Sequence, residues 1–232
     1  MRHMKAHRGQ IRKISVCLGL SLLLLGQTLQ GQQSAADEKK FAEIHARAEK
    51  GNAQAQFIVG YCYTIGFGVA TNWVKAVIWF RKAAEQNVAP AQYNMGECYD
   101  HGLGVTQDIA EAVKWYRKAA EQNMPAAQFN LGVCYKHGDG VVKDFVAAAS
   151  WYRKAAEQNY PDAQLNLGVC YINGQGVKED DAEGYKWFVL ASAQGLEPAK
   201  IAVIKLDAVL TPEQIADGKQ RAASWLKGHP KP

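Results

Sequence analysis

A 36-residue pattern is written four times in this chain of 232 residues, and no other feature constrains the fold as much. Gly-x-Cys-Tyr begins at Gly60 and Gly-x-Gly-Val at Gly66, and both return every 36 residues. A tryptophan followed by an aromatic residue has the same period, starting at Trp79. A fixed period of about 20–50 residues indicates one supersecondary unit stacked on copies of itself. Such a stack offers a long binding surface, whereas a catalytic site needs a few unlike residues gathered once.

Residues 89–124 show how one repeat is built. Ala91, Met95 and Cys98 have the i, i+4, i+7 spacing of one apolar helix face. Asn123 stands where a second helix ends, and Asn is a residue that tolerates the left-handed backbone found there. Polar residues that cap helix starts precede the four second helices: Asn72, Asp108, Asp144 and Asp180. The pattern predicts an all-α fold of antiparallel helix pairs joined by glycine turns.

The repeats divide the chain into a series of segments. We expect a signal peptide, an N-terminal capping helix, four repeats, and a C-terminal partial repeat with a capping helix: residues 1–36, 37–52, 53–88, 89–124, 125–160, 161–196 and 197–228. The last helix has a complete start signal, with Thr211 as the cap and Gln214 three residues later. A terminal repeat has to be soluble on its outer side, so we expect this helix to close the stack with a polar outer face.

The amino terminus has the pattern of an export signal. Residues 1–31 contain five basic residues, all within the first 13 positions, and no acidic residue. An apolar run at residues 14–25 comes directly after the basic residues. That run suits the core of a signal peptide and is shorter than the roughly 20 residues that span a bilayer as a helix. We expect cleavage after Gly31 or after Ala36, and a periplasmic or extracellular protein without a membrane span. An uncleaved N-terminal anchor is the alternative.

The rest of the chain is electrically neutral, because its 22 basic residues balance 22 acidic residues. A neutral body lacks the positive patch that binds nucleic acid, so we expect no nucleic-acid partner. We expect a monomer.

Four of the five cysteines occupy one equivalent site in each repeat. Equivalent helices in stacked repeats lie about 8–10 Å or more apart, whereas a disulfide needs Cα atoms within about 7 Å. The four cysteines are therefore expected to be unpaired, small, buried residues: Cys62, Cys98, Cys134 and Cys170. The same spacing prevents them from converging on one ion, and we expect neither a metal site nor a cofactor.

The best candidate for a binding surface is a series of residues on one side of the first helices. It comprises a recurring asparagine, the residues three positions later, and two histidines seven positions later: Asn94, Asn130, Asn166, Tyr61, Glu97, Val133, Val169, His101 and His137. Asparagine amides on a concave first-helix face would hydrogen-bond an extended ligand backbone. Alternatively, each asparagine satisfies a turn or a carbonyl inside the protein. The two histidines are either exposed residues at helix ends or weak metal ligands.

The repeat resembles the Sel1-like repeat, a relative of the tetratricopeptide repeat with a longer, glycine-containing turn. The resemblance rests on residues 91–105, Trp115, Tyr116 and residues 118–122, and it covers about residues 53–227. The chain departs from the family at two positions. Its Gly-x-Cys-Tyr motif has Cys where these repeats often have a larger apolar residue, and its second helices end with Asn where Gly is usual. The resemblance implies a right-handed α-solenoid that acts as an adaptor for other proteins or peptides.

An enzymatic alternative comes from the same family. Some cysteine-rich exported relatives are described as binding or slowly hydrolysing β-lactams, but they carry paired cysteines in each repeat and this chain carries one. A Ser-x-x-Lys occurs at Ser224 to Lys227 without the Ser-Asp-Asn or Lys-Thr-Gly motifs that accompany it in such enzymes. The sequence therefore predicts a non-enzymatic scaffold without catalytic residues, and a β-lactam-binding protein is the alternative.

Overall fold

The computed structural model describes residues 35–229, where all regular structure is helical. The chain divides into two compact units, and the boundary lies between Asn94 and Met95. The predicted export signal, residues 1–36, lies outside the described residues except for Ala35 and Ala36, with which the first described helix begins. Within residues 35–229, no helix combines the length and the apolar character needed to cross a bilayer.

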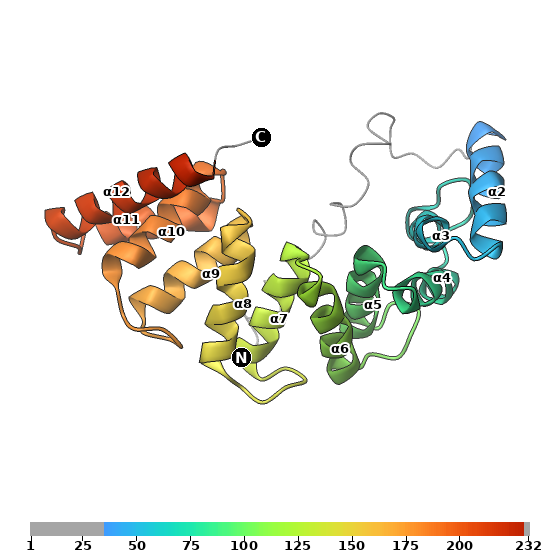
Figure 1. Ribbon diagram of the computed structural model, residues 1–232, viewed down its shortest axis with the longest axis horizontal. Helices are drawn as coiled ribbons and strands as arrows, with labels where there is room; N and C mark the ends of the chain where they lie inside the picture. Colours follow the sequence, from blue (N-terminus) through green and yellow to red (C-terminus); the bar gives the residue numbers. More distant parts are fainter. Residues whose placement is uncertain (1–34, 230–232) are drawn as a thin grey trace. The chain divides into compact units, whose positions relative to one another are not determined.

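The first unit contains the N-terminal cap and the first repeat. Its helices are α2 (Ala35–Glu49), α3 (Ala53–Ile65), α4 (Trp73–Glu85) and the start of α5 (Ala89–His101). Helix α3 packs against both α2 and α4 (Figure 1). The aromatic rings of Phe57 and Phe80 lie 6.0 Å apart between α3 and α4, and they form part of the core of this unit.

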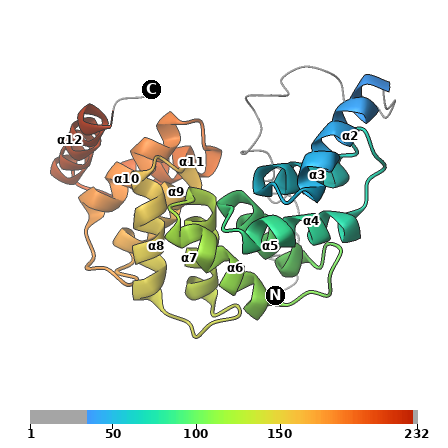
Figure 2. The same cartoon turned by 45° about the vertical axis from the view of Figure 1, so that its right-hand side comes forward.

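The second unit continues the same arrangement through the remaining repeats. Its helices are the end of α5, α6 (Ile109–Glu121), α7 (Pro125–His137), α8 (Phe145–Glu157), α9 (Pro161–Ile172), α10 (Asp181–Ala193), α11 (Glu197–Asp207) and α12 (Pro212–Gly228). From α6 to α10, each helix packs against the next one in the chain, as Figure 1 and Figure 2 show. The unit is thus a succession of helix-turn-helix repeats.

The glycine of Gly-x-Cys-Tyr is needed because an aromatic ring of the second helix occupies the space of its missing side chain. A Cβ atom on Gly132 would lie 2.7 Å from Cδ1 of Tyr152. Tyr116 covers Gly96 in the same way. Two helices approach this closely only where one of them has no side chain, so the repeated glycine sets the packing distance within each helix pair.

The helix ends agree with the expectations from the sequence. Asn87, Asn123 and Asn159 have φ values of 64°, 62° and 62°, which confirms the left-handed conformation expected at the end of the second helices. The side chain of Asp108 accepts a hydrogen bond of 2.9 Å from the backbone N–H of Glu111. Asn72, Asp144 and Asp180 cap their helices in the same way, as predicted.

The C-terminal end exposes apolar residues on α11 and in the turn after it, whereas the last helix, α12, for which the sequence predicts a polar outer face, exposes residues such as Glu213, Lys219 and Gln220. Ile204, where the four repeats have glycine, is 68% exposed, and Val209 is 75% exposed. An isoleucine at this position blocks the close approach that glycine allows within a repeat. Helix α12 packs on α10, where a Cβ atom on Gly218 would lie 2.8 Å from Cδ1 of Tyr185. Apolar residues of α11 therefore remain exposed.

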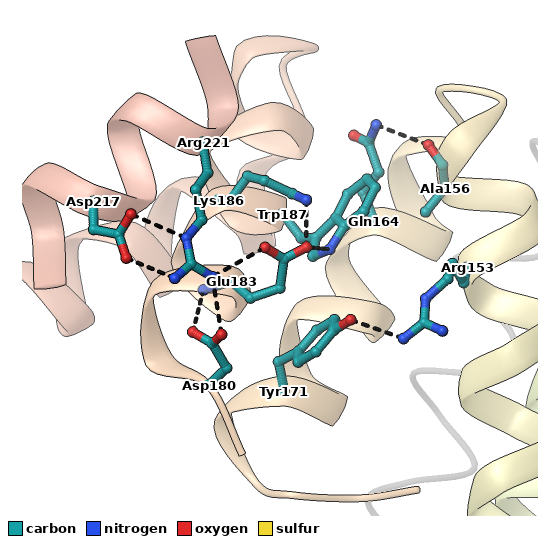
Figure 3. A network of polar contacts seen from close by, with 10 residues as sticks. All are labelled: Arg153, Ala156, Gln164, Tyr171, Asp180, Glu183, Lys186, Trp187, Asp217 and Arg221. Atoms are coloured by element: carbon teal, nitrogen blue, oxygen red, sulfur yellow. Dashed lines mark hydrogen bonds and ion pairs between the residues drawn. The ribbon is translucent and has the colours of Figure 1, made fainter. Parts of the chain in front are cut away.

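A group of charged side chains holds α12 against α10 (Figure 3). Arg221 of α12 lies 2.9 Å from Asp180 and 3.3 Å from Glu183, and it also pairs with Asp217 of its own helix at 2.6 Å. Glu183 additionally contacts Lys186. These contacts define the orientation of α12 and occupy the start of α10.

Candidate functional site

Buried glutamines join each first helix to the second helix that precedes it. They are the second residue of the repeated Ala-Gln pair: Gln56, Gln92, Gln128 and Gln164. The side-chain amide of Gln128 donates to the carbonyl of Ala120 at 3.1 Å, and that of Gln164 donates to Ala156 at 3.2 Å (Figure 3). These carbonyls lie in the last turn of a helix, where the glutamine adds a donor from the next repeat to the turn hydrogen bonds that Asn123 and Asn159 make. The glutamines thus satisfy backbone groups between repeats.

A second set of glutamines completes the connection. Gln158 donates to the side-chain oxygen of Gln128 at 2.8 Å, and Gln194 donates to that of Gln164 at 2.8 Å. Gln86 donates in the same way within the first unit. Sequence reasoning missed this ladder, although the recurrence of Gln in all four Ala-Gln pairs was a visible signal. These amides join successive repeats, and the members of the Ala-Gln pairs are buried.

The predicted asparagine series is also engaged in internal contacts. The amide of Asn130 donates to Glu97 at 2.8 Å, which links two successive repeats. The amide of Asn166 donates to the carbonyl of Asp162 at 2.9 Å, and its oxygen accepts from Lys136 at 3.2 Å. For these two residues, the geometry supports the structural interpretation of the series. Asn94, the third member, is half-buried on α5.

Glu97 differs most from the expected exposed position. Its side chain is buried, with 8% of the residue exposed, and it accepts a hydrogen bond of 2.6 Å from the hydroxyl of Tyr116. The ring of Tyr116 occupies the space beside Gly96, next to Glu97 in the sequence. The carboxylate of Glu97 therefore points toward the second helix and toward Asn130 of the next repeat. Glu97 is therefore part of the interior and is not a freely accessible contact. The equivalent residues Tyr61, Val133 and Val169 are half-buried.

The two predicted histidines have different surroundings. His101 lies at the end of α5 near two carboxylates, with Nε2 3.7 Å from Glu97 and 3.8 Å from Asp100. His137 is exposed at the end of α7. The structure brings Glu97, His101 and Asn130 together, whereas His137 lies at the equivalent place one repeat later.

Two surface pockets recur at the turns of consecutive repeats. The larger has a volume of about 630 Å³ and includes Tyr135, Phe145 and Val146 in its lining, while the smaller has about 430 Å³ and includes Tyr171. Arg117 donates to the Tyr135 hydroxyl at 2.8 Å, and Arg153 donates likewise to Tyr171 (Figure 3).

The larger pocket is bordered by exposed apolar residues. Val142, in its lining, is 88% exposed, and Val146 is 66% exposed. In the equivalent smaller pocket, Lys178 stands in place of Val142. Exposed apolar residues gathered beside a pocket are typical of interaction sites. Sequence reasoning did not find this surface, although Val142 is an apolar residue at a turn position where the second and fourth repeats have Thr106 and Lys178.

The four described cysteines are buried and form no disulfide with one another, which confirms their expected role in the core. Burial raises the pKa of Cys62 to about 11 and that of Cys98 to about 12, and it also raises the pKa of Cys170. Thiolates are the reactive form of cysteine, so these thiols are poor nucleophiles near neutral pH. Ser224 and Lys227, the ends of the Ser-x-x-Lys match, are both exposed on α12. They are distant in sequence from the residues that line the two pockets, and the sequence has neither of the accompanying motifs, Ser-Asp-Asn and Lys-Thr-Gly.

Comparison with known proteins identifies the repeat. The model of the Sel1 repeat matches residues 53–88, 89–124, 125–160 and 161–196. A crystal structure of a Sel1 repeat protein from Oxalobacter formigenes is 36% identical and has a TM-score of 0.68, covering 73% of this chain and 50% of its own. No curated protein matches the chain.

A second solved structure gives the same result. The protective antigen c5321 of uropathogenic Escherichia coli, which displays an SLR fold, is 35% identical with a TM-score of 0.70. The match covers 81% of this chain and 40% of that protein. The chain thus spans half or less of the length of these two proteins. The all-α solenoid fold of helix-turn-helix repeats, expected from the sequence, is confirmed.

Proposed function

The chain belongs to the Sel1 repeat family, and we propose that it is a non-enzymatic scaffold whose first helices bind a protein or an extended peptide. Proteins built from Sel1 repeats generally act as scaffolds for protein–protein interactions. One observation carries the proposal for this chain. Polar side chains of the first helices, such as Asn130 and Gln164, make hydrogen bonds between successive repeats. Val133 and Val169, at equivalent positions of α7 and α9, are instead partly exposed.

The first-helix surface consists, in the second unit, of Val133, Val169 and His137. The first two present partly exposed apolar groups, and Val133 also packs against the core. Apolar contacts on a rigid backbone lower the entropy lost on binding. His137 adds an exposed polar group at the end of α7.

The pocket beside Tyr135 is a second candidate surface for the same function. Its exposed border residues, Val142 and Val146, belong to the turn and to the start of α8 rather than to a first helix. A partner bound there would approach the molecule from the turns. The two surfaces share no residue, so mutations can separate them.

The test is affinity capture from the native host with three forms of the tagged chain. The first is the wild type, the second carries Val133→Lys and Val169→Lys, and the third carries Val142→Lys and Val146→Lys. We expect a captured protein whose recovery falls in the second form and persists in the third. Melting curves of all three forms control for unfolding, since surface substitutions shift stability by only about 0.5 kcal/mol.

The opposite pattern would move the site to the turn pocket, and loss of capture in neither form would refute both surfaces. The β-lactam alternative has its own measurement, hydrolysis of a chromogenic cephalosporin by the purified chain. The buried thiols of Cys62 and Cys98 support a prediction of no turnover above the protein-free rate. Sustained turnover that disappears in Ser224→Ala would instead establish the enzymatic alternative.

We also propose that the protein acts outside the cytoplasm. The basic residues and the apolar run of residues 1–31 support this location. Mass measurement of the protein from its native host is the test, and we expect a chain that begins after Gly31 or near Asp37. A full-length chain in the membrane fraction would show the uncleaved anchor instead.

A further inference from the structure

Three side chains of metal-ligand type converge at the end of α5. Each of Glu97, Asp100 and His101 contributes one ligand atom, and these atoms all lie within 4.8 Å of one another. We propose that they form a binding site for a divalent transition-metal cation, with Zn²⁺ as the representative ion. This site is separate from the proposed partner-binding surface and goes beyond the scaffold function.

The geometry is close to that of a coordinated ion. Nε2 of His101 lies 3.7 Å from Oε2 of Glu97 and 3.8 Å from Oδ2 of Asp100. Ligands of a zinc ion stand about 2.0–2.2 Å from the metal and therefore about 3–3.5 Å from one another. The two distances from His101 exceed this range by only a few tenths of an ångström, and the three ligand atoms would have to draw together from separations of at most 4.8 Å. Residues at i, i+3 and i+4 of one helix share a face, so this approach needs no change in the backbone.

The buried carboxylate is oriented from two other helices. One oxygen of Glu97, Oε1, accepts hydrogen bonds from the hydroxyl of Tyr116 on α6 at 2.6 Å and from the amide of Asn130 on α7 at 2.8 Å. The other oxygen, Oε2, is the one that faces His101. Outer contacts of this kind hold metal-binding carboxylates in place and strengthen coordination.

The other repeats show that this group is specific to the second one. The three equivalent positions in the third repeat are Val133, Lys136 and His137, so a histidine remains there without either carboxylate. A buried carboxylate is costly unless it is paired, and a neutral glutamine could have accepted the hydrogen bond from Tyr116 equally well. The second repeat thus has both carboxylates and the histidine at the three positions from which they can bind one ion.

The donor set indicates the class of ion. Two carboxylates and one imidazole suit the divalent ions of the first transition row, whereas Ca²⁺ and Mg²⁺ prefer oxygen ligands alone. The side chains of Asp100 and His101 are 18% and 24% exposed, so the site opens to solvent on that side. Water would fill the remaining positions around the ion.

The test compares His101→Asn with the matched variant His137→Asn in the purified full chain. Zn²⁺ binding is followed by calorimetry, and Co²⁺ is used as a coloured probe of the same site. We expect the wild type and His137→Asn each to bind one Zn²⁺ ion with similar affinity. We expect His101→Asn to bind Zn²⁺ at least tenfold more weakly. The Co²⁺ absorption bands should be lost in His101→Asn alone. Tyr116→Phe should weaken binding about tenfold, because the carboxylate loses an orienting contact.

Two outcomes would overturn the proposal. One is wild-type protein that takes up no Zn²⁺ at millimolar concentration, which would leave the group as a set of ion pairs. The other is His101→Asn with wild-type affinity, which would place the bound ion elsewhere, for example on the histidines of residues 1–34 or on cysteine thiols. Asp100→Asn provides the same comparison if His101→Asn fails to fold.

Discussion

The hydroxyl of Tyr116 donates a hydrogen bond of 2.6 Å to the buried carboxylate of Glu97. One repeat later, Tyr152 has the same place in the fold, but Val133 stands where Glu97 would be. The hydroxyl of Tyr152 is buried and has no hydrogen-bond partner among the described residues. Equivalent positions of the repeat therefore contain one satisfied and one unsatisfied hydroxyl.

This difference predicts opposite effects of the same substitution. Tyr116→Phe should lower the free energy of unfolding by about 1–3 kcal/mol, because the buried Glu97 carboxylate loses a donor. Tyr152→Phe should be neutral or stabilising, because it removes a polar group that has no partner. Urea unfolding of the two variants gives the comparison. Equal losses would show that the hydrogen bond to Glu97 adds nothing.

The glutamine ladder predicts a large loss from a single polar residue. Gln128→Ala should lower the free energy of unfolding by about 1–3 kcal/mol, because the carbonyl of Ala120 and the amide of Gln158 both lose a partner. Gln220→Ala, on the exposed side of α12, is the control and should change stability by less than about 0.5 kcal/mol. Urea unfolding measures both variants. A small effect at Gln128 would mean that water replaces the ladder.

The buried thiols predict slow labelling in the folded protein. Cys62, Cys98, Cys134 and Cys170 should react slowly with a maleimide at pH 7, and completely in denaturant without reductant. Mass spectrometry of the labelled peptides identifies each site. Failure of any of the four to react in denaturant would reveal a disulfide and contradict the stacking geometry.

The same thiols predict a loss of stability in alkali. The pKa of Cys98 rises from its ordinary value of 9.0 to about 12 in the fold because burial disfavours the thiolate. A raised pKa contributes stability below pH 9 that disappears as the pH rises toward 12. The free energy of unfolding should therefore fall above pH 9 and fall less steeply in Cys98→Ala. Parallel curves for the two proteins would exclude Cys98 as a cause.

Much of the fold could be predicted from the sequence because the repeat encodes local structure. The spacing of Ala91, Met95 and Cys98 predicts a helix, and α5 spans Ala89–His101. The caps at Asn72 and Asp108 and the left-handed Asn123 are local features, determined by residues a few positions apart. Four copies in phase made each of these expectations consistent with the others.

The candidate site was less predictable. Periodicity places Glu97 on the side of the helix next to the apolar face, but it does not say which way a side chain at that edge turns. Tyr116 and Asn130, from two other helices, draw the carboxylate inward. The end of the chain gives a second example. The pattern of a single helix did not show that α12 packs on α10 and leaves Ile204 of α11, at a position where the repeats have glycine, exposed.

By itself, the sequence determined the helical repeat, the positions of turns and caps, and the burial of the cysteines, because these follow from spacing along one chain. Only the tertiary structure decided which polar residues join repeats, where α12 packs, and that Glu97, Asp100 and His101 converge. The reason is physical: the partners of a side chain at a helix edge come from neighbouring helices. Their contribution depends on packing distances of a few ångströms, which a repeat period does not specify.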